Sequence, residues 1–451
     1  MPGQSVYELD TIISYRRIWN IAWPIILGSV AQNLINVTDT AFLGRVGEIA
    51  LGAGAIGGIY YFTAVMLAWG FGIGMQIIVA RRFGEDKFTE IGKTVEHGFY
   101  FLLPLAVLVF TTMKFLSDDV MLFIIKSEDI YRETINYINY RSYGIFLVYI
   151  NILFRGFYVG IARTRVITWT TAVLAAVNIF FDWCLIFGNL GFPEMGIEGA
   201  ALASVIAEIT ATIFFIGYTL VKVPLSKYQL FRFAKFSREL YFRVIRISLP
   251  MMLQNFISLS AWLTFFLFVE KMGETQLAIS NIIRSFYVVL MIPMWGFSSA
   301  TNTLVSFLIG KDRRDEVMPL IYKVLILCLA GVAFIVSFGF IFPDAALRIY
   351  TNDPELIELA RPVLYVVNVA ALMLSSAFIF FSGVSGTGKT QVSFTIEVIV
   401  LLLYLVFNYF LVYVLESSIE FVWMSEYLYA GLLGLLSYLY LKTGRWRETV
   451  V

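Results

Sequence analysis

Twelve apolar segments, each long enough to cross a lipid bilayer, follow one another along this chain of 451 residues. A membrane-spanning helix needs about 20 predominantly apolar residues. Only 14% of the residues are charged, where a globular protein carries about 25%. We therefore expect an all-α membrane protein with twelve transmembrane helices. The segments cover residues 17–43, 54–80, 94–116, 135–161, 166–188, 196–221, 245–269, 277–308, 317–342, 357–386, 391–414 and 418–441.

Lysine and arginine are unevenly divided between the two sets of predicted loops. The termini and the even-numbered loops hold 23 of them, and the odd-numbered loops hold 7. Because basic residues are in excess on the cytoplasmic side of a membrane protein, both termini are predicted to be cytoplasmic. The first segment follows Arg16 and Arg17 without a small-residue cleavage site after it. It predicts a retained helix rather than a signal peptide, in a multi-pass plasma (inner) membrane protein.

The two halves of the sequence repeat each other at one constant offset, which carries position 24 onto position 250. Between residues 24–84 and 250–310, 14 of 61 positions are identical without a gap, and Pro24 falls on Pro250 and Trp69 on Trp295. Six helices per half place both copies in the same orientation. We therefore predict parallel six-helix lobes, residues 1–221 and 245–451, with a substrate cleft between them.

The segment between the halves, residues 222–244, carries six basic residues together with several aromatic ones. This mixture is typical of a helix that lies on a lipid surface with its apolar face down. We expect a cytoplasmic amphipathic linker here.

Ionisable and amide side chains inside the predicted membrane helices are the candidate functional residues. Asp39 lies in the first predicted helix, and Asn178 and Asp182 lie four residues apart on one face of the fifth. A charge at the bilayer centre costs about 2.5–3.5 kcal/mol, so it needs a partner or a function. Gln32 and Asn36 provide further polar atoms on the first helix.

The repeat indicates that these acids serve a function of one lobe. Asp39 aligns with Phe265 and Asp182 with Asn408, so the second half lacks both acids, and we expect the acidic site in the first half only. Two buried carboxyls can share one proton near neutral pH, and with amide oxygens they can also surround Na⁺. The alternative is a structural hydrogen-bond network. Glu208 and Glu397 are weaker candidates that fit snorkelling or structural charges.

Two further patterns argue against enzymatic chemistry. Residues 383–390 satisfy the G-x-x-x-x-G-K-[ST] phosphate-loop pattern, but they follow a membrane helix rather than a strand, so we predict a tight cytoplasmic turn. Cys184 and Cys328 lie in different predicted helices, and a single histidine excludes histidine-based metal sites. We expect no enzymatic activity and no cofactor beyond a coupling ion.

Several motifs together resemble the multidrug and toxic compound extrusion (MATE) family of the MOP superfamily. They are Pro24, the stretch 39–44, Trp69-Gly70, residues 199–204, and the turn 155–164 with its twin before Lys389. The resemblance covers about residues 12–445. It implies a V-shaped pair of six-helix lobes that export organic, often cationic, compounds in exchange for H⁺ or Na⁺.

The resemblance also implies roles for individual residues. In the DinF-like branch the coupling-ion site lies in the first lobe, and its residues match positions of this chain, with Pro24 as the proline that bends the first helix. Helices 7 and 10 lack the acids of the NorM-like branch, which favours the DinF-like one. The matching ion-site positions are Asp39, Tyr137, Asn178, Asp182 and, with serine in place of threonine, Ser204.

We therefore predict a monomeric, cation-coupled antiporter whose partners are small organic substrates and the lipid bilayer, without nucleic acid. Two alternatives remain: a flippase of lipid-linked oligosaccharide or lipid from the same superfamily, and an ATP-driven protein. The first often has extra helices or a strongly cationic lumen, which this chain lacks, and an ATPase assay tests the second.

Overall fold

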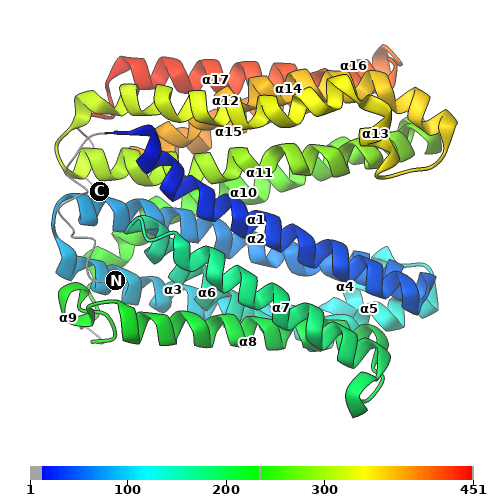
Figure 1. The fold of residues 1–451 in the computed structure, drawn as a ribbon, viewed down its shortest axis with the longest axis horizontal. Helices are drawn as coiled ribbons and strands as arrows, with labels where there is room; N and C mark the ends of the chain where they lie inside the picture. Colours follow the sequence, from blue (N-terminus) through cyan, green and yellow to red (C-terminus); the bar gives the residue numbers. More distant parts are fainter. Residues whose placement is uncertain (1–12, 233–234, 449–451) are drawn as a thin grey trace.

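A computed structural model describes residues 13–232 and 235–448, and every regular element in these ranges is a helix (Figure 1). The first lobe comprises α1 (Tyr15–Val46), α2 (Glu48–Gly84), α3 (Phe88–Phe115), α4 (Ser117–Ile124), α5 (Glu128–Arg141), α6 (Gly144–Gly160), α7 (Arg165–Phe187) and α8 (Gly196–Lys222). After α9 (Leu225–Tyr228), the second lobe comprises α10 (Arg238–Met272), α11 (Glu274–Gly310), α12 (Val317–Ile341), α13 (Pro343–Arg348), α14 (Pro354–Gly386), α15 (Thr390–Tyr409), α16 (Ile419–Trp423) and α17 (Ser425–Thr443). Short 3₁₀ or π turns cover Asn189–Gly191, Arg314–Glu316 and Phe410–Val414.

The predicted set of membrane spans is confirmed, with one change. Eleven spans are long and apolar enough to cross a bilayer, and α5 with α6 completes a twelfth that is bent by 51°. A continuous helix over 135–161 is therefore wrong. The chain breaks after Arg141, where the hydroxyl of Ser142 donates to the carbonyl of Asn139 at 3.1 Å and competes with the helical pattern.

The backbone repeats in the two lobes as the sequence does. The helix pairs α1 and α10, and α2 and α11, end at equivalent positions of the repeat. Left-handed backbone also recurs at equivalent positions, at Asp86 and Asp312 and at Ala162 and Gly388. Gly388 belongs to the phosphate-loop pattern, which spans the end of α14 and the turn before α15 and follows no strand. That pattern is a helix–helix turn, as predicted.

The two lobes are joined near the chain termini. Gln76 of α2 donates from Nε2 to the carbonyl of Ser299 and to the hydroxyl of Thr303 on α11, each at 2.9 Å. Closer to the helix ends, Lys311 pairs with Asp86 at 2.8 Å. The helix α1 starts beside α11 and crosses to α7 in the first lobe (Figure 1).

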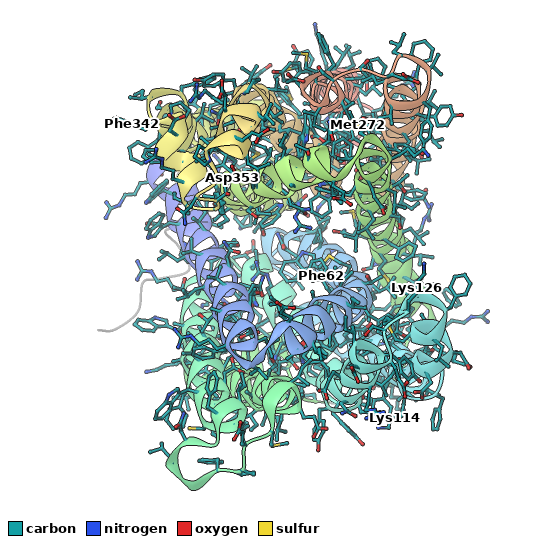
Figure 2. All side chains as sticks on the ribbon, turned by 90° about the vertical axis from the view of Figure 1, so that its right-hand side faces the viewer. Phe62, Lys114, Lys126, Met272, Phe342 and Asp353 are labelled. Atoms are coloured by element: carbon teal, nitrogen blue, oxygen red, sulfur yellow. The ribbon has the colours of Figure 1, made fainter. Side chains whose placement is uncertain are left out.

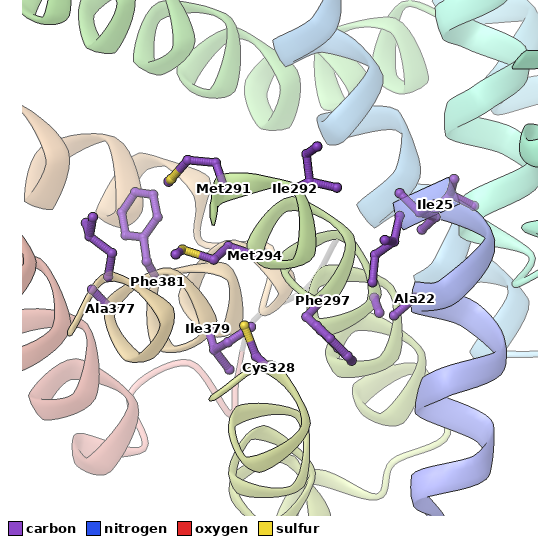
Figure 3. Close-up of a cluster of buried hydrophobic side chains, with 14 of the residues drawn as sticks. Ala22, Ile25, Met291, Ile292, Met294, Phe297, Cys328, Ala377, Ile379 and Phe381 are labelled. Carbon is purple, nitrogen blue, oxygen red and sulfur yellow. The ribbon is translucent and has the colours of Figure 1, made fainter. Parts of the chain in front are cut away.

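Apolar packing reinforces this junction. A cluster of buried side chains extends from α1 through α11 into α12 and α14, with Ala22 and Ile25 on the α1 side and Phe297 on the α11 side (Figure 3). Between membrane helices such packing stabilises the junction through van der Waals contacts, because lipid tails are themselves as apolar as these side chains. Viewed from the end away from the termini, α1 and α2 face α10 and α11 across the middle of the molecule (Figure 2).

The linker differs from the expected amphipathic surface helix. Within 222–244, α8 ends at Lys222, α9 has only four residues, and α10 already begins at Arg238; residues 233 and 234 lie outside the described part. The buried side chain of Tyr228 packs on Phe88 of α3, with ring centroids 6.0 Å apart. Tyr228 therefore anchors the linker to the first lobe, and the described residues between Lys222 and Arg238 contain no helix longer than α9.

Candidate cation-binding site

The two predicted aspartates meet between α1 and α7. The carboxyls of Asp39 and Asp182 lie within hydrogen-bonding reach of each other. Asp182 is fully buried, and Asp39 is half-buried. Both lie in the halves of their helices that are farther from the chain termini. The structure thus brings together two acids that are far apart in the sequence.

Two more of the predicted residues complete this cluster. Asn178, one turn before Asp182, is buried, and its Nδ2 donates to the hydroxyl of Ser204 on α8 at 3.5 Å. Several buried oxygens of the cluster accept no hydrogen bond from any described residue. They are Oδ1 of Asp39, Oδ1 of Asn178 and both carboxyl oxygens of Asp182. Buried acceptors without donors are costly, so these oxygens call for a proton or a cation.

Tyr137 is connected to the cluster through a residue that the sequence analysis did not name. It lies on α5, four residues before Arg141, and its hydroxyl contacts the guanidinium of that arginine. Arg141 also lies close enough to attract both aspartates. The sequence does hold a signal for Arg141, because it is a charged residue inside the predicted membrane span 135–161.

Arg141 forms a buried ion pair with Glu208 of α8. Its Nη1 and Nη2 donate to the two carboxyl oxygens at 2.9 and 2.7 Å, and Tyr61 of α2 adds a hydroxyl at 3.1 Å. The guanidinium also lies 3.7 Å from the centre of the Tyr61 ring. Glu208 is therefore a paired residue rather than a lone or snorkelling charge. Such a bidentate pair holds both side chains in one geometry.

Gln32 and Asn36 do not join the cluster. Both side chains lie on exposed positions of α1, and in the described ranges neither hydrogen-bonds to the aspartates or to Asn178. Their role as supporting polar residues of the site is therefore not borne out by the geometry. Positions 32, 36 and 39 share one face of a regular helix, so helical spacing does not separate them from Asp39. What separates them is that Gln32 and Asn36 are exposed, whereas Asp39 is half-buried.

Pro24 is placed where α1 meets α7. Because proline has no N–H, the carbonyl of Asn20 loses its helical donor, and the hydroxyl of Thr164 donates to it at 3.4 Å. The hydroxyl of Thr168 donates to the carbonyl of Pro24 itself at 2.7 Å. The helix that carries Asp182 therefore also satisfies the backbone of α1 around its proline.

Buried acids are not confined to the first half, although the second half lacks counterparts of Asp39 and Asp182. Glu397 of α15 is 2% exposed and Glu426 of α17 is 5% exposed, so the second lobe buries two acids of its own. Aligning the two halves at Asp39 and Asp182 does not reveal these glutamates, because the aligned positions in the second half are a phenylalanine and an asparagine. Glu426 also has no acidic counterpart in the first half, since it aligns with Ala200.

Twelve spans in two repeated lobes, with a buried polar site inside one lobe, define a polytopic membrane transporter. The MatE family model matches residues 24–184 and again residues 250–410, two blocks that begin and end at equivalent positions of the repeat. The chain belongs to this family, the multidrug and toxic compound extrusion transporters. The matched blocks cover most of each lobe and include Asp39 and Asp182, whereas α8 and α17 lie outside them.

Curated relatives resemble the chain along most of its length. A protein of Thermotoga maritima named "Probable multidrug resistance protein NorM" is 24% identical, over 100% of this chain and 96% of that protein. Its namesake of Agrobacterium fabrum is 25% identical, over 76% and 73% of the two chains. These names do not distinguish the DinF-like branch, which stays a prediction.

Solved structures share the fold. A multidrug resistance MATE family transporter of the MOP superfamily in an outward-facing conformation superposes with a TM-score of 0.91 at 18% identity, over all of both chains. A MOP superfamily transporter from Pyrococcus furiosus gives 0.90 at 19% identity, again over all of both chains. The two-lobed architecture predicted from the repeat is thereby confirmed.

Proposed function

We propose that this protein is an antiporter that exports organic, often cationic, compounds across the inner membrane in exchange for H⁺ or Na⁺. The names of the curated relatives support drug export. The observation that carries the coupling is the Asp39–Asp182 pair, with its buried oxygens that accept no hydrogen bond. A static structural network would be expected to supply donors to those oxygens.

Charge balance at the cluster favours a bound cation. Asp39, Asp182 and Glu208 carry three negative charges when ionised, and Arg141 supplies one positive charge. Since Arg141 is already held by both oxygens of Glu208, the aspartate pair keeps an excess of negative charge. A proton shared by the two carboxyls, or Na⁺ between them and Asn178, reduces this excess.

Coupling to export follows from the position of Asp39 on α1. Cation binding draws Asp39 and Asp182 together and so changes how α1 packs on α7 beyond Pro24. We propose that this movement lowers the affinity for the exported compound. The lobes are joined at the end with the termini, so we place the substrate opening at the other end, which the basic loops predict to be extracytoplasmic. The membrane potential adds about 2.3 kcal/mol per charge per 100 mV.

Neutral substitutions at the pair test the proposal. In cells loaded with a fluorescent organic cation, we expect Asp39→Asn and Asp182→Asn to reach the membrane at normal levels. Each should lower the initial efflux rate at least about tenfold, which corresponds to about 1.4 kcal/mol. Asp119→Asn, an exposed acid of the same lobe, is the control and should export normally. Efflux at the wild-type rate in both aspartate variants would remove the pair from the mechanism.

A further inference from the structure

The second lobe holds two buried acids that the proposed coupling site does not use. Glu426 lies at the start of α17, near the end of the bundle away from the termini, and Glu397 lies in the first half of α15. Both side chains are more than nine-tenths buried among helices of their own lobe. A buried acid needs either a cationic partner or a neutral form.

Glu426 accepts hydrogen bonds from two tyrosine hydroxyls. Tyr404 of α15 donates to Oε1 at 3.0 Å, and Tyr287 of α11 donates to Oε2 at 3.2 Å. In the part of the chain that the structure describes, no lysine, arginine or histidine pairs with this carboxyl. Arg284, one turn before Tyr287, lies instead over the ring of Phe266, 5.4 Å from its centre.

Glu397 leaves one oxygen without any donor. Its Oε1 accepts from the hydroxyl of Ser258 on α10 at 2.7 Å and from that of Tyr429 on α17 at 3.0 Å. Its Oε2 is buried, and no described residue hydrogen-bonds to it. A neutral carboxyl fits this arrangement, because one oxygen then accepts both hydrogen bonds and the other carries the proton.

In the first lobe, Glu208 also accepts a hydrogen bond from a tyrosine, but it is paired with an arginine and so stays charged. Tyr61 donates to Glu208, and its counterpart in the repeat, Tyr287, donates to Glu426. Arg141 neutralises Glu208, but position 367, which aligns with Arg141, is a buried valine. Position 434, which aligns with Glu208, is a glycine. The second lobe therefore places a different glutamate beside the equivalent tyrosine, and it does so without the cation.

We propose that Glu397 and Glu426 are proton-binding carboxyls of the second lobe, separate from the Asp39–Asp182 pair. The titratable groups that face them are Tyr287, Tyr404 and Tyr429, and none of these supplies positive charge at neutral pH. Na⁺ fits less well, since it requires several oxygen ligands and the hydroxyls here point their protons at the carboxyls. The bound species is therefore the proton itself.

Infrared spectroscopy of the purified full-length chain tests this directly, without transport. A protonated carboxyl has its own carbonyl band, and ¹³C labelling of glutamate shifts the bands of Glu but not those of Asp. We expect glutamate-derived bands of protonated carboxyls in the wild type at neutral pH. One component should disappear in Glu397→Gln and another in Glu426→Gln, while the bands of aspartate remain in both.

Glu208→Gln is the matched control, because Arg141 keeps Glu208 charged, so no protonated-carboxyl band should be lost. If no glutamate-derived band exists in labelled wild-type protein, the proposal fails, and this result needs no variant to fold. Loss of the same band in Glu208→Gln, or a band that Na⁺ abolishes, would also contradict it. The Asp39–Asp182 pair contributes only aspartate bands. The glutamate bands therefore test this proposal separately from the proposed coupling site.

Discussion

At the scale of single residues, the site depends on which charges are paired. Sequence spacing predicts that Asn178 and Asp182 share a face, and an alignment of the halves singles out the aspartates. Neither shows that Arg141 is bound by Glu208, because that contact joins positions 67 apart across two helices. Partners between helices follow from packing, and packing is not encoded at any fixed spacing.

The ion pair depends on a glycine at the start of α6. A Cβ at Gly144 would collide with Glu208, Arg141 and the hydroxyl of Tyr61. We expect Gly144→Ala to lower the free energy of unfolding by about 1–3 kcal/mol through overpacking and to reduce efflux. Gly58→Ala on α2 is the control, since no atom lies within 4 Å of its Cβ. Thermal unfolding in detergent measures the stability of both variants. If Gly144→Ala were as stable as Gly58→Ala, the Arg141–Glu208 ion pair would tolerate displacement.

A charged loop residue gives a pH-dependent prediction. Burial raises the pKa of Glu85, but hydrogen bonds from Arg82 and Lys87 outweigh it and hold that pKa below its usual value. Because the folded-state pKa is depressed, the stabilisation is present at neutral pH and disappears as the pH falls through that pKa. Glu85→Gln should therefore cost about 1 kcal/mol at pH 7 and almost nothing once the pH has fallen well below the depressed pKa of Glu85.

Thermal unfolding as a function of pH measures this difference. Glu128→Gln removes an exposed pair with Arg132 and serves as the control, with an effect near zero at every pH. A Glu85→Gln penalty that persists unchanged at low pH would contradict the linkage to the Glu85 carboxylate.

At the scale of helices, α1 and α7 act together around Pro24. We expect Thr168→Val, which removes the donor to the carbonyl of Pro24, to cost about 1 kcal/mol and to speed hydrogen exchange in α1. Thr171→Val is the control, because its hydroxyl donates to the carbonyl of Ile167 within its own helix, at 2.9 Å, and not to a carbonyl of α1. If both variants exchange alike in α1, the contact from α7 does not hold the proline region.

Helix number and order could be predicted from hydropathy, but helix continuity could not. The span 135–161 has the composition of one helix, and its 51° break follows from how Ser142 and the Arg141 ion pair pack. The linker is similar, since its basic and aromatic residues fit a surface helix, yet Tyr228 packs against α3. In both places tertiary contacts override local pattern.

At the scale of the whole molecule, a duplicated sequence predicts a duplicated fold, and the structure confirms it through the left-handed turns at Asp86 and Asp312. Function departs from that symmetry. The first lobe pairs its glutamate with an arginine and leaves two aspartates for a cation, whereas the second lobe has glutamates without a cationic partner among the described residues. Aligning the two halves of the sequence reveals the aspartates of the first lobe, but it does not reveal the glutamates of the second lobe.

The central claim is that cation binding at the aspartate pair drives export, and transport in reconstituted vesicles tests it most directly. Movement of a fluorescent organic cation is followed while a pH gradient and a Na⁺ gradient are imposed separately. For the wild type we expect one of the two gradients to drive uphill movement of the compound, and for Asp39→Asn neither. Uphill movement without any cation gradient, or gradient-driven movement that survives in Asp39→Asn, would contradict the account.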